Sequence, residues 1–147
     1  MIMTEKYKIL AKFIKDMSSE TPDIDTYLFV KDNLANYSLQ IDIKSKPLKN
    51  KILQVETKLA YSDKNENKKK SFFEMIYATV IRLNDDITKK DDLGKIILCD
   101  LQNKIYPELE KSFLQMLHSS GYPHLKFNKK IDFEELYKKN QVSNIKF

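Results

Sequence analysis

The stretch that decides the fold is Tyr37-Ser38-Leu39-Gln40-Ile41-Asp42-Ile43-Lys44, in which apolar and polar side chains alternate without a break. A period of two residues is typical of a β-strand with one face toward a core and the other toward water. Segment 53–61 repeats the alternation, and the turn-forming segment 46–50 lies between the two. We therefore expect these strands to form an antiparallel hairpin.

Two further strands are expected on either side of this hairpin. Segment 7–16 alternates less cleanly, and its apolar second face leaves a short helix as an alternative. Segment 72–83 alternates over its whole length but carries apolar residues on both faces. The connection 17–36 is expected to be irregular. The second face of the sheet then needs cover, either from residues 22–36 of this connection or from a partner.

The hydrophobic period changes after residue 90, which predicts helices. Apolar residues recur every three or four positions from 91 to 121, and Pro107 inside this segment predicts a kink or a break. Gly121 is a candidate C-terminal cap, and a short last helix is expected to begin at Asp132. The expected fold class is α+β: a four-stranded antiparallel sheet, then a long kinked or broken helix and a short C-terminal helix.

Composition excludes several classes of protein. The 147 residues and 17.4 kDa fit a single domain, which we place at 1–147 with a core at about 7–138 and a short tail at 139–147. A hydrophobic share of 41% and a charged share of 32% are those of a globular chain. The N-terminus lacks the apolar core of a signal peptide, no apolar run could insert into a membrane, and Cys99 is the single cysteine. We expect a cytoplasmic protein without disulfides.

The residues that could carry chemistry are few. Two glycines are too few for a glycine-rich nucleotide loop, and two histidines with one cysteine are too few for a structural zinc site. His118 and His124 have no nucleophile at a recognisable spacing, and the acidic pairs lie at turns or helix starts, where capping explains them. We expect no cofactor, no metal and no enzymatic activity.

The net charge of +5 leaves two interpretations open. A basic chain with a pI of about 9.1 suggests an anionic partner such as nucleic acid. However, 25 of the 26 basic residues are lysines, and Arg82 is the only arginine, whereas base-reading and phosphate sites favour arginine. Abundant Lys, Ile and Asn are also what an AT-rich genome tends to encode, so we favour solvated lysines as the explanation of the charge and keep an anionic partner as the alternative.

Five further segments stand out in order along the chain: Lys15-Asp16-Met17-Ser18-Ser19-Glu20-Thr21-Pro22; Lys46-Pro47-Leu48 with the strand at 53–59; Glu74-Met75-Ile76-Tyr77-Ala78; Gly121-Tyr122-Pro123-His124-Leu125; and Ile131-Asp132-Phe133-Glu134-Glu135-Leu136-Tyr137. In this order they resemble motifs of the SecB family of protein-export chaperones. Each motif alone is weak, but their common order over residues 7–138 is fairly specific.

The resemblance implies a homotetramer built as a dimer of dimers, and an ATP-independent holdase that delivers unfolded precursor proteins to the SecA motor. It implies that the carboxylates of Asp16, Glu20 and Glu74 bind SecA, whose docking tail is basic in this family's systems. The alternative is that these three are ordinary solvated carboxylates without a binding role. As client-binding residues we predict a set of apolar and aromatic side chains for which core packing is the alternative: Tyr37, Leu39, Phe133, Leu136 and Tyr137.

Two other functions stay open. One is a SecB-like chaperone dedicated to a single client, such as an antitoxin, with no export role. The other is a small basic nucleic-acid-binding module, which we disfavour because the lysine-rich loop 62–70 has no interleaved aromatic residues to stack bases.

Overall fold

The computed structural model describes residues 6–65 and 69–138, so the predicted tail 139–147 and Lys68 of the lysine-rich loop lie outside the described residues. The described residues form a four-stranded antiparallel sheet in the order β1-β4-β3-β2. Its strands are β1 (Tyr7–Glu20), β2 (Tyr37–Pro47), β3 (Ile52–Asp63) and β4 (Phe72–Leu83). The predicted sheet and its β2–β3 hairpin are confirmed, and the helical alternative for segment 7–16 is wrong.

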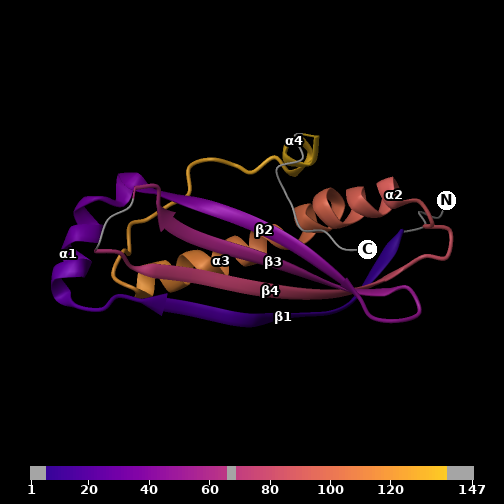
Figure 1. The fold of residues 1–147 in the computed structure, drawn as a ribbon, viewed down its shortest axis with the longest axis horizontal. Coiled ribbons are helices and arrows are strands. Elements are labelled where there is room, and N and C mark those ends of the chain that lie inside the picture. The colour runs from indigo at the N-terminus through magenta and orange to yellow at the C-terminus, as the bar shows by residue number, and fades with distance from the viewer. Residues whose placement is uncertain (1–5, 66–68, 139–147) are drawn as a thin grey trace.

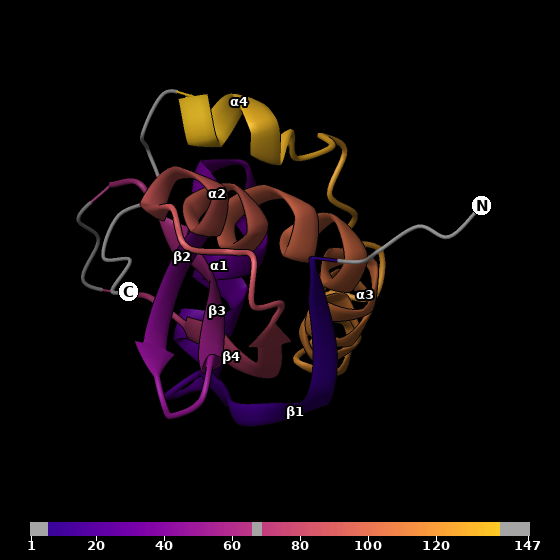
Figure 2. The same cartoon turned by 90° about the vertical axis from the view of Figure 1, so that its right-hand side faces the viewer.

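The helices lie on one face of this sheet and at its ends (Figures 1 and 2). A long helical segment crosses that face and consists of α2 (Lys90–Lys95), a π-helical turn (Ile96–Asp100) and α3 (Leu101–Ser119). The short C-terminal helix α4 (Phe133–Lys138) packs on the outside of this segment. Helix α1 (Ile24–Asp32) and a 3₁₀ turn (Leu34–Asn36) lie at one end of the sheet.

The connection 17–36 is ordered, so the prediction of an irregular segment is wrong. Strand β1 continues to Glu20, and α1 begins after Asp23. The Asp23 carboxylate accepts a hydrogen bond from the Thr26 backbone N–H at 2.8 Å, which is the geometry of a helix N-cap. The sequence Thr21-Pro22-Asp23 therefore starts a helix rather than breaking the chain.

Two β-bulges explain why the alternation along β1 is imperfect. The pairing of β1 with β4 shifts between Ile9 and Ala11, and again between Ile14 and Asp16. Each bulge inserts an extra residue, which moves the following side chains to the opposite face. Strand β1 consequently presents apolar side chains on both faces, a pattern that also fits a short helix.

The expected break at Pro107 is also wrong, because α3 runs through it without interruption. Pro107 has no backbone N–H, so the carbonyl of Asn103, one turn earlier, has no helical hydrogen-bond donor. Both residues lie on the exposed side of α3. Water can bond that carbonyl, so the helix continues. The irregularity lies instead at the π-helical turn, where the Leu101 N–H bonds to the Ile96 carbonyl five residues back.

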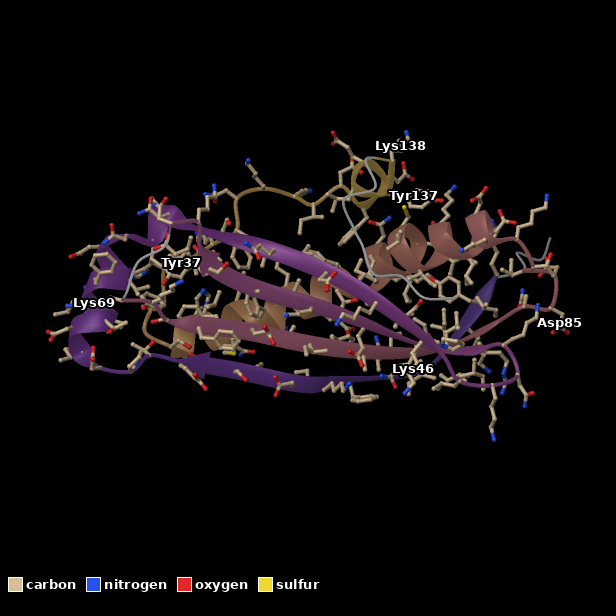
Figure 3. All side chains as sticks on the ribbon, in the orientation of Figure 1. Tyr37, Lys46, Lys69, Asp85, Tyr137 and Lys138 are labelled. Carbon is tan, nitrogen blue, oxygen red and sulfur yellow. The ribbon has the colours of Figure 1, made fainter. Side chains whose placement is uncertain are left out.

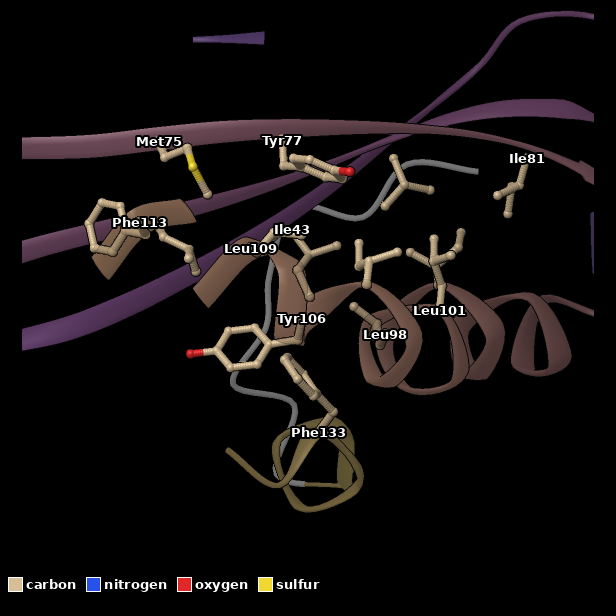
Figure 4. Close-up of a cluster of buried hydrophobic side chains, with 14 of the residues drawn as sticks. Ile43, Met75, Tyr77, Ile81, Leu98, Leu101, Tyr106, Leu109, Phe113 and Phe133 are labelled. Atoms are coloured by element: carbon tan, nitrogen blue, oxygen red, sulfur yellow. The ribbon is translucent and has the colours of Figure 1, made fainter. Parts of the chain in front are cut away.

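The core lies between the sheet and the long helical segment (Figure 4). Met75, Tyr77 and Ile81 of β4 face Leu109 and Phe113 of α3, and all five are buried. On the far side of the helix, the Phe133 ring packs edge-on against the Tyr106 ring at a centroid distance of 5.4 Å, which fastens α4.

The opposite face of the sheet, here called the outer face, is not covered by any described element (Figure 2). On β4 it carries Glu74, Ile76 and Val80, half-buried between their neighbours, and Phe72, whose side chain is 47% exposed. The connection 17–36 does not fold back over it, because β1 and α1 take up that segment.

Candidate functional site

A groove of about 1040 Å³ runs beside the free edge of β2. One wall consists of the consecutive residues 37–41 of β2, and the opposite wall consists of the loop 126–132 and one side of α4. This volume is at the upper end of the ~300–1,000 Å³ typical of small-molecule sites. A smaller hollow of about 450 Å³ adjoins the groove at Lys126 and Asn128, which line both.

Aromatic packing and capping hold the loop wall in place. The Phe127 ring packs against Tyr61 of β3 and Phe113 of α3, at centroid distances of 5.6 and 6.3 Å. The Asp132 carboxylate accepts the Glu135 backbone N–H at 3.1 Å and caps α4. The loop is therefore held beside the edge of the sheet at two residues, Phe127 and Asp132.

Gly121 sets the direction in which the chain leaves α3. Its φ of +115° is one that glycine adopts readily, and the Tyr122 N–H bonds back to the Leu117 carbonyl at 3.2 Å. The Tyr27 hydroxyl donates to the Gly121 carbonyl at 2.8 Å, which fastens α1 to this corner. The predicted glycine cap is confirmed.

The inner end of the groove is apolar and its rim is charged. Burial raises the pKa of the Tyr37 and Tyr61 phenols, so both are neutral hydrogen-bonding groups on an apolar surface. The Tyr37 hydroxyl accepts the Ser71 N–H at 3.3 Å. Exposed lysines lie along the loop wall, namely Lys126, Lys129 and Lys130, and two carboxylates lie toward α4, Asp132 and Glu135.

Three of the five predicted client-binding residues line this groove, namely Tyr37, Leu39 and Leu136. Phe133 instead lies in the core at 2% exposure. Tyr137 lies on α4 outside the groove lining, and its hydroxyl donates to the Asp91 carbonyl at 3.4 Å. Figure 3 shows Tyr37 near the α1 end of β2 and Tyr137 at α4.

The sequence analysis assigned no client-binding role to the loop wall, although Ile131 begins one of the family motifs. Phe127 and Ile131 supply its apolar part, and Tyr61 of β3 completes the floor. The loop contains single apolar residues in a lysine-rich, irregular segment, so neither helical nor strand periodicity marks them. Two isolated large apolar residues in a polar loop were the available signal.

The three predicted acids lie together on the outer face. Ser18 of β1 is paired with Glu74 of β4, and Asp16 and Glu20 flank Ser18 on the same side of β1. Glu74 is thus the diagonal neighbour of both other carboxylates, a relation that places such residues about 7–8 Å apart. Asp16 and Glu20 are exposed, whereas Glu74 is half-buried and paired with Lys58 at 3.2 Å.

Two side chains that were considered as candidates for catalysis, His118 and Cys99, have a structural partner or are buried. His118 Nε2 lies 2.8 Å from the Leu125 carbonyl, and burial raises the pKa of the Cys99 thiol. Among residues 6–65 and 69–138, no group of three His, Cys, Asp or Glu side chains is arranged to hold a metal ion. None of the helices in the described part of the chain is long and apolar enough to span a membrane.

Comparison with known proteins agrees with this architecture. The family model described as "SecB: Preprotein translocase subunit SecB" matches residues 3–144. The chain belongs to the SecB family. It is 55% identical over 136 residues to the "Putative protein-export protein SecB" of Pelagibacter ubique, covering 92% of this chain and 97% of that one. It is 25% identical over 129 residues to SecB of Xanthobacter autotrophicus, covering 88% and 81%.

A solved structure shares the fold at low sequence identity. It is the Rv1957 SecB-like chaperone of Mycobacterium tuberculosis in complex with a ChAD peptide from the HigA1 antitoxin, with a TM-score of 0.61 at 10% identity. The alignment covers 85% of this chain and 91% of that one. The SecB family is a family of chaperones in protein export, not of enzymes, and this coarse function applies to the chain.

Proposed function

We propose that the protein is an ATP-independent holdase that binds unfolded precursor proteins in the cytoplasm and hands them to SecA. The observation that carries this proposal is the groove of about 1040 Å³ between the β2 edge and the loop 126–132. It offers half-buried apolar side chains such as Leu39, Ile131 and Leu136 beside neutral tyrosines. Such a surface can compete with the self-association of an unfolded client.

Holding without nucleotide is consistent with the chain itself. Two glycines in 147 residues leave no room for a phosphate-cradling loop. The direct test is aggregation of a denatured precursor followed by light scattering, with and without the chaperone and in the absence of nucleotide. We expect suppression by the parent protein and weaker suppression by the double variant Leu39→Ser and Leu136→Ser.

The matched control for this variant is Leu48→Ser. Leu48 lies in the β2–β3 turn, away from the groove, and its side chain is 48% exposed. Equal loss of suppression in the groove variant and in the Leu48 control would refute the assignment of the groove, provided that both variants keep the parent's circular dichroism.

We infer pairing of two chains at the free edge of β1, and the family resemblance extends this dimer to a homotetramer. This edge strand carries four large apolar side chains that are 41–47% exposed, namely Leu10, Phe13, Ile14 and Met17. A long exposed apolar edge strand is a pairing site for another chain. We expect a light-scattering mass near four times 17.4 kDa, in keeping with the dimer of dimers that the family resemblance implies.

Lysines on this edge should break the assembly. Replacing Phe13 and Met17 with lysine should lower the mass, because charged edge residues oppose strand pairing. Leu28→Lys is the control, since Leu28 is 49% exposed on α1. A parent protein of monomeric mass at micromolar concentration would contradict the inferred tetramer.

For SecA, we propose docking at the carboxylates of the outer face. Asp16, Glu20 and Glu74 form one patch, and a basic partner segment would associate faster with it and in a fixed orientation. Each rim pair is typically worth ~0.2–1 kcal/mol, so a single reversal weakens binding only a few-fold. The triple change to lysine should be much more damaging, and most visibly at low salt.

The control keeps the same net charge change elsewhere on the surface. It is a triple change to lysine of exposed carboxylates off the outer face: Asp32, Asp85 and Asp86. We expect titration calorimetry to show weak SecA binding for the patch variant only, with client holding intact in both. Equal SecA affinity of the two triple variants would exclude the patch as the docking site.

The dedicated-client alternative has one supporting observation, the shared fold with the Rv1957 chaperone, which was solved with an antitoxin peptide. At 10% identity that likeness concerns the fold alone, whereas the 55% identical relative is named for protein export. Suppression of aggregation for several unrelated precursors would favour the export role. Binding of a single client only would favour the alternative.

A further inference from the structure

Cationic side chains gather at the end of the outer face that adjoins the β2–β3 turn. Lys8 of β1 lies directly opposite Arg82 of β4, the single arginine of the chain, and Arg82 lies opposite Ile52 of β3. Lys46 of β2 belongs to the same face, because its partner in β3 is two residues from Ile52. Lys49 follows in the turn itself, and all four cationic side chains are exposed.

These four cations have no ionic partner among the residues that the structure describes. The ion pairs of the outer face, those of Glu56 and Glu74, use other lysines. Two aspartates lie nearby in the loop 84–89, but this loop leads to α2 on the opposite face of the sheet. Like charges directly opposite each other on neighbouring strands destabilise a sheet. The pairing of Lys8 with Arg82 therefore favours an anion that comes from outside the chain.

An apolar side chain is exposed in the middle of this basic end. Leu48 is 48% exposed and lies between Lys46 and Lys49 in the sequence. The turn that carries it is fixed, because Lys51, at a φ of +64°, donates through its ammonium group to two carbonyls of the loop 84–89, at 3.0 and 2.9 Å. Leu48 is thus presented to the outside from a turn that is fastened to the body of the protein.

We propose that this basic tip, defined as Lys8, Lys46, Leu48, Lys49 and Arg82, binds the surface of a bilayer that contains anionic phospholipids. Each basic side chain held near such a surface strengthens binding about fivefold, so four cations supply roughly several hundredfold. A leucine among them can enter the boundary between headgroups and acyl chains. The contact would be reversible, and it depends neither on client holding nor on SecA docking.

The chemistry of the tip fits a bilayer better than a nucleic acid. None of its five residues is aromatic, so no base can stack on it. Arg82 is its only planar fork, whereas lysines act as point charges, which suffice for a dense anionic surface. Leu48 would stay in water against a sugar–phosphate backbone, but it loses contact with water in a lipid interface.

Co-sedimentation of the purified chain with vesicles tests the proposal without SecA or client. We expect binding to vesicles of phosphatidylcholine with phosphatidylglycerol, and none to phosphatidylcholine alone. Raising the salt from about 0.1 M to about 1 M shortens the screening length from about 10 to about 3 Å and should release the protein. The triple variant Lys46→Glu, Lys49→Glu and Arg82→Glu should bind about a hundredfold more weakly or worse. It spares Lys8, which lies on the edge strand inferred to pair with another chain.

The matched control makes the same change of net charge at the opposite end of the sheet. It is Lys64→Glu, Lys69→Glu and Lys70→Glu, at three exposed lysines of the loop 62–70. Figure 3 shows Lys69 at that end and Lys46 at the tip. Because the control sites are several screening lengths from the tip, we expect a loss of less than about fivefold. Equal losses in the two triple variants would show that only net charge matters and would overturn the proposal.

A gain of signal at Leu48 supplies a second test. The chain has no tryptophan, so Leu48→Trp places a single reporter in the tip. Its emission should shift to shorter wavelength on anionic vesicles and be quenched by brominated acyl chains, because tryptophan favours the membrane interface. Leu28→Trp on α1 is the control, since Leu28 is 49% exposed, and it should show neither effect. Vesicle binding without a response at residue 48 would place the contact elsewhere and overturn the proposal.

Two soluble probes distinguish the other anionic partners. Millimolar inorganic phosphate at constant ionic strength should not displace the protein from vesicles, and displacement would indicate a site for single phosphate groups. Binding of a single-stranded RNA of about twenty nucleotides should fall equally in the two triple variants, because it would report net charge alone. RNA binding that is lost only in the tip variant would assign the tip to nucleic acid. Either of these results, or a lack of binding to anionic vesicles, would refute the membrane contact.

Discussion

Two buried threonines offer a sharp test of how the long helix is fastened to the sheet. Thr57 of β3 and Thr79 of β4 both face the helices at 0% exposure. The Thr57 hydroxyl donates to Gln102 Oε1 at 3.0 Å, and Gln102 Nε2 donates to the Ile97 carbonyl at 3.2 Å, within the π-helical turn. The Thr79 hydroxyl has no hydrogen-bond partner among the described residues. Replacement by valine keeps the shape of either side chain and removes only the hydroxyl.

The two substitutions should have different effects on the free energy of unfolding. Thr57→Val leaves the Gln102 oxygen buried without a donor, which costs about 1–3 kcal/mol. Thr79→Val removes a hydroxyl that already lacks a partner, so stability should stay unchanged or rise by about 1 kcal/mol. For a chain of this length, 1 kcal/mol shifts the melting temperature by roughly 2–4 °C. We expect Thr57→Val to lower it by roughly 2–12 °C.

Differential scanning calorimetry at one fixed protein concentration measures both variants, because self-association makes melting concentration-dependent. The double variant Thr57→Val and Gln102→Leu removes both partners and should recover part of the stability lost by Thr57→Val alone. If Thr79→Val destabilised the protein as much as Thr57→Val, the presence of a hydrogen-bond partner would not determine the cost of losing the hydroxyl. The hydrogen bond between Thr57 and Gln102 would then not be the source of the stability lost by Thr57→Val.

Three other outcomes follow from single contacts. Gly121→Ala should destabilise by about 2 kcal/mol or more in chemical denaturation, because φ is +115° and the new Cβ would clash with Cε1 of Tyr27. The hydrogen bond from Lys15 lowers the pKa of the Glu56 carboxyl in the folded protein. The contact therefore stabilises the fold above the pKa that Glu56 has in the unfolded chain, and this stabilisation is lost as the pH falls through the lower pKa of the folded protein. Glu56→Gln should therefore differ from the parent near neutral pH and converge with it below about pH 4. Asp132→Ala should speed amide exchange within α4, and unchanged exchange would argue against the cap.

The sheet was predictable because most of its strands have one face toward a core. In β3 the alternation of buried and half-buried residues is unbroken from Leu53 to Tyr61, which is the pattern from which the strand was predicted. Strand β1 was harder because two bulges shift its phase, and helix α1 was missed because Asp23 was taken as a breaker. Local sequence cannot distinguish a cap from a turn when the following helix has only a weak apolar face.

The candidate site was predictable only where it coincides with a regular element. Tyr37 and Leu39 were found because they lie on an alternating strand, and Leu136 because it lies on a capped helix. The loop wall with Phe127 and Ile131 depends on where the chain goes after Gly121, which is set by long-range packing on Tyr61 and Tyr27. No local pattern encodes that path.

The net charge of +5 does not conflict with the proposed acidic docking patch, because Arg82 and Lys8 lie far from it on the outer face. Glu74 lies toward the α1 end of β4, whereas Arg82, paired with Lys8, lies at the other end. Glu74 and Arg82 are eight positions apart along β4, about 26 Å, which is roughly three screening lengths at physiological salt. Lys58 offsets the charge of Glu74, so a basic segment at the patch chiefly meets Asp16 and Glu20, and the distant basic side chains contribute little. Raising the salt concentration should weaken SecA binding even though the whole chain is basic. Binding that strengthened with salt would mean that repulsion by the net charge outweighs the patch.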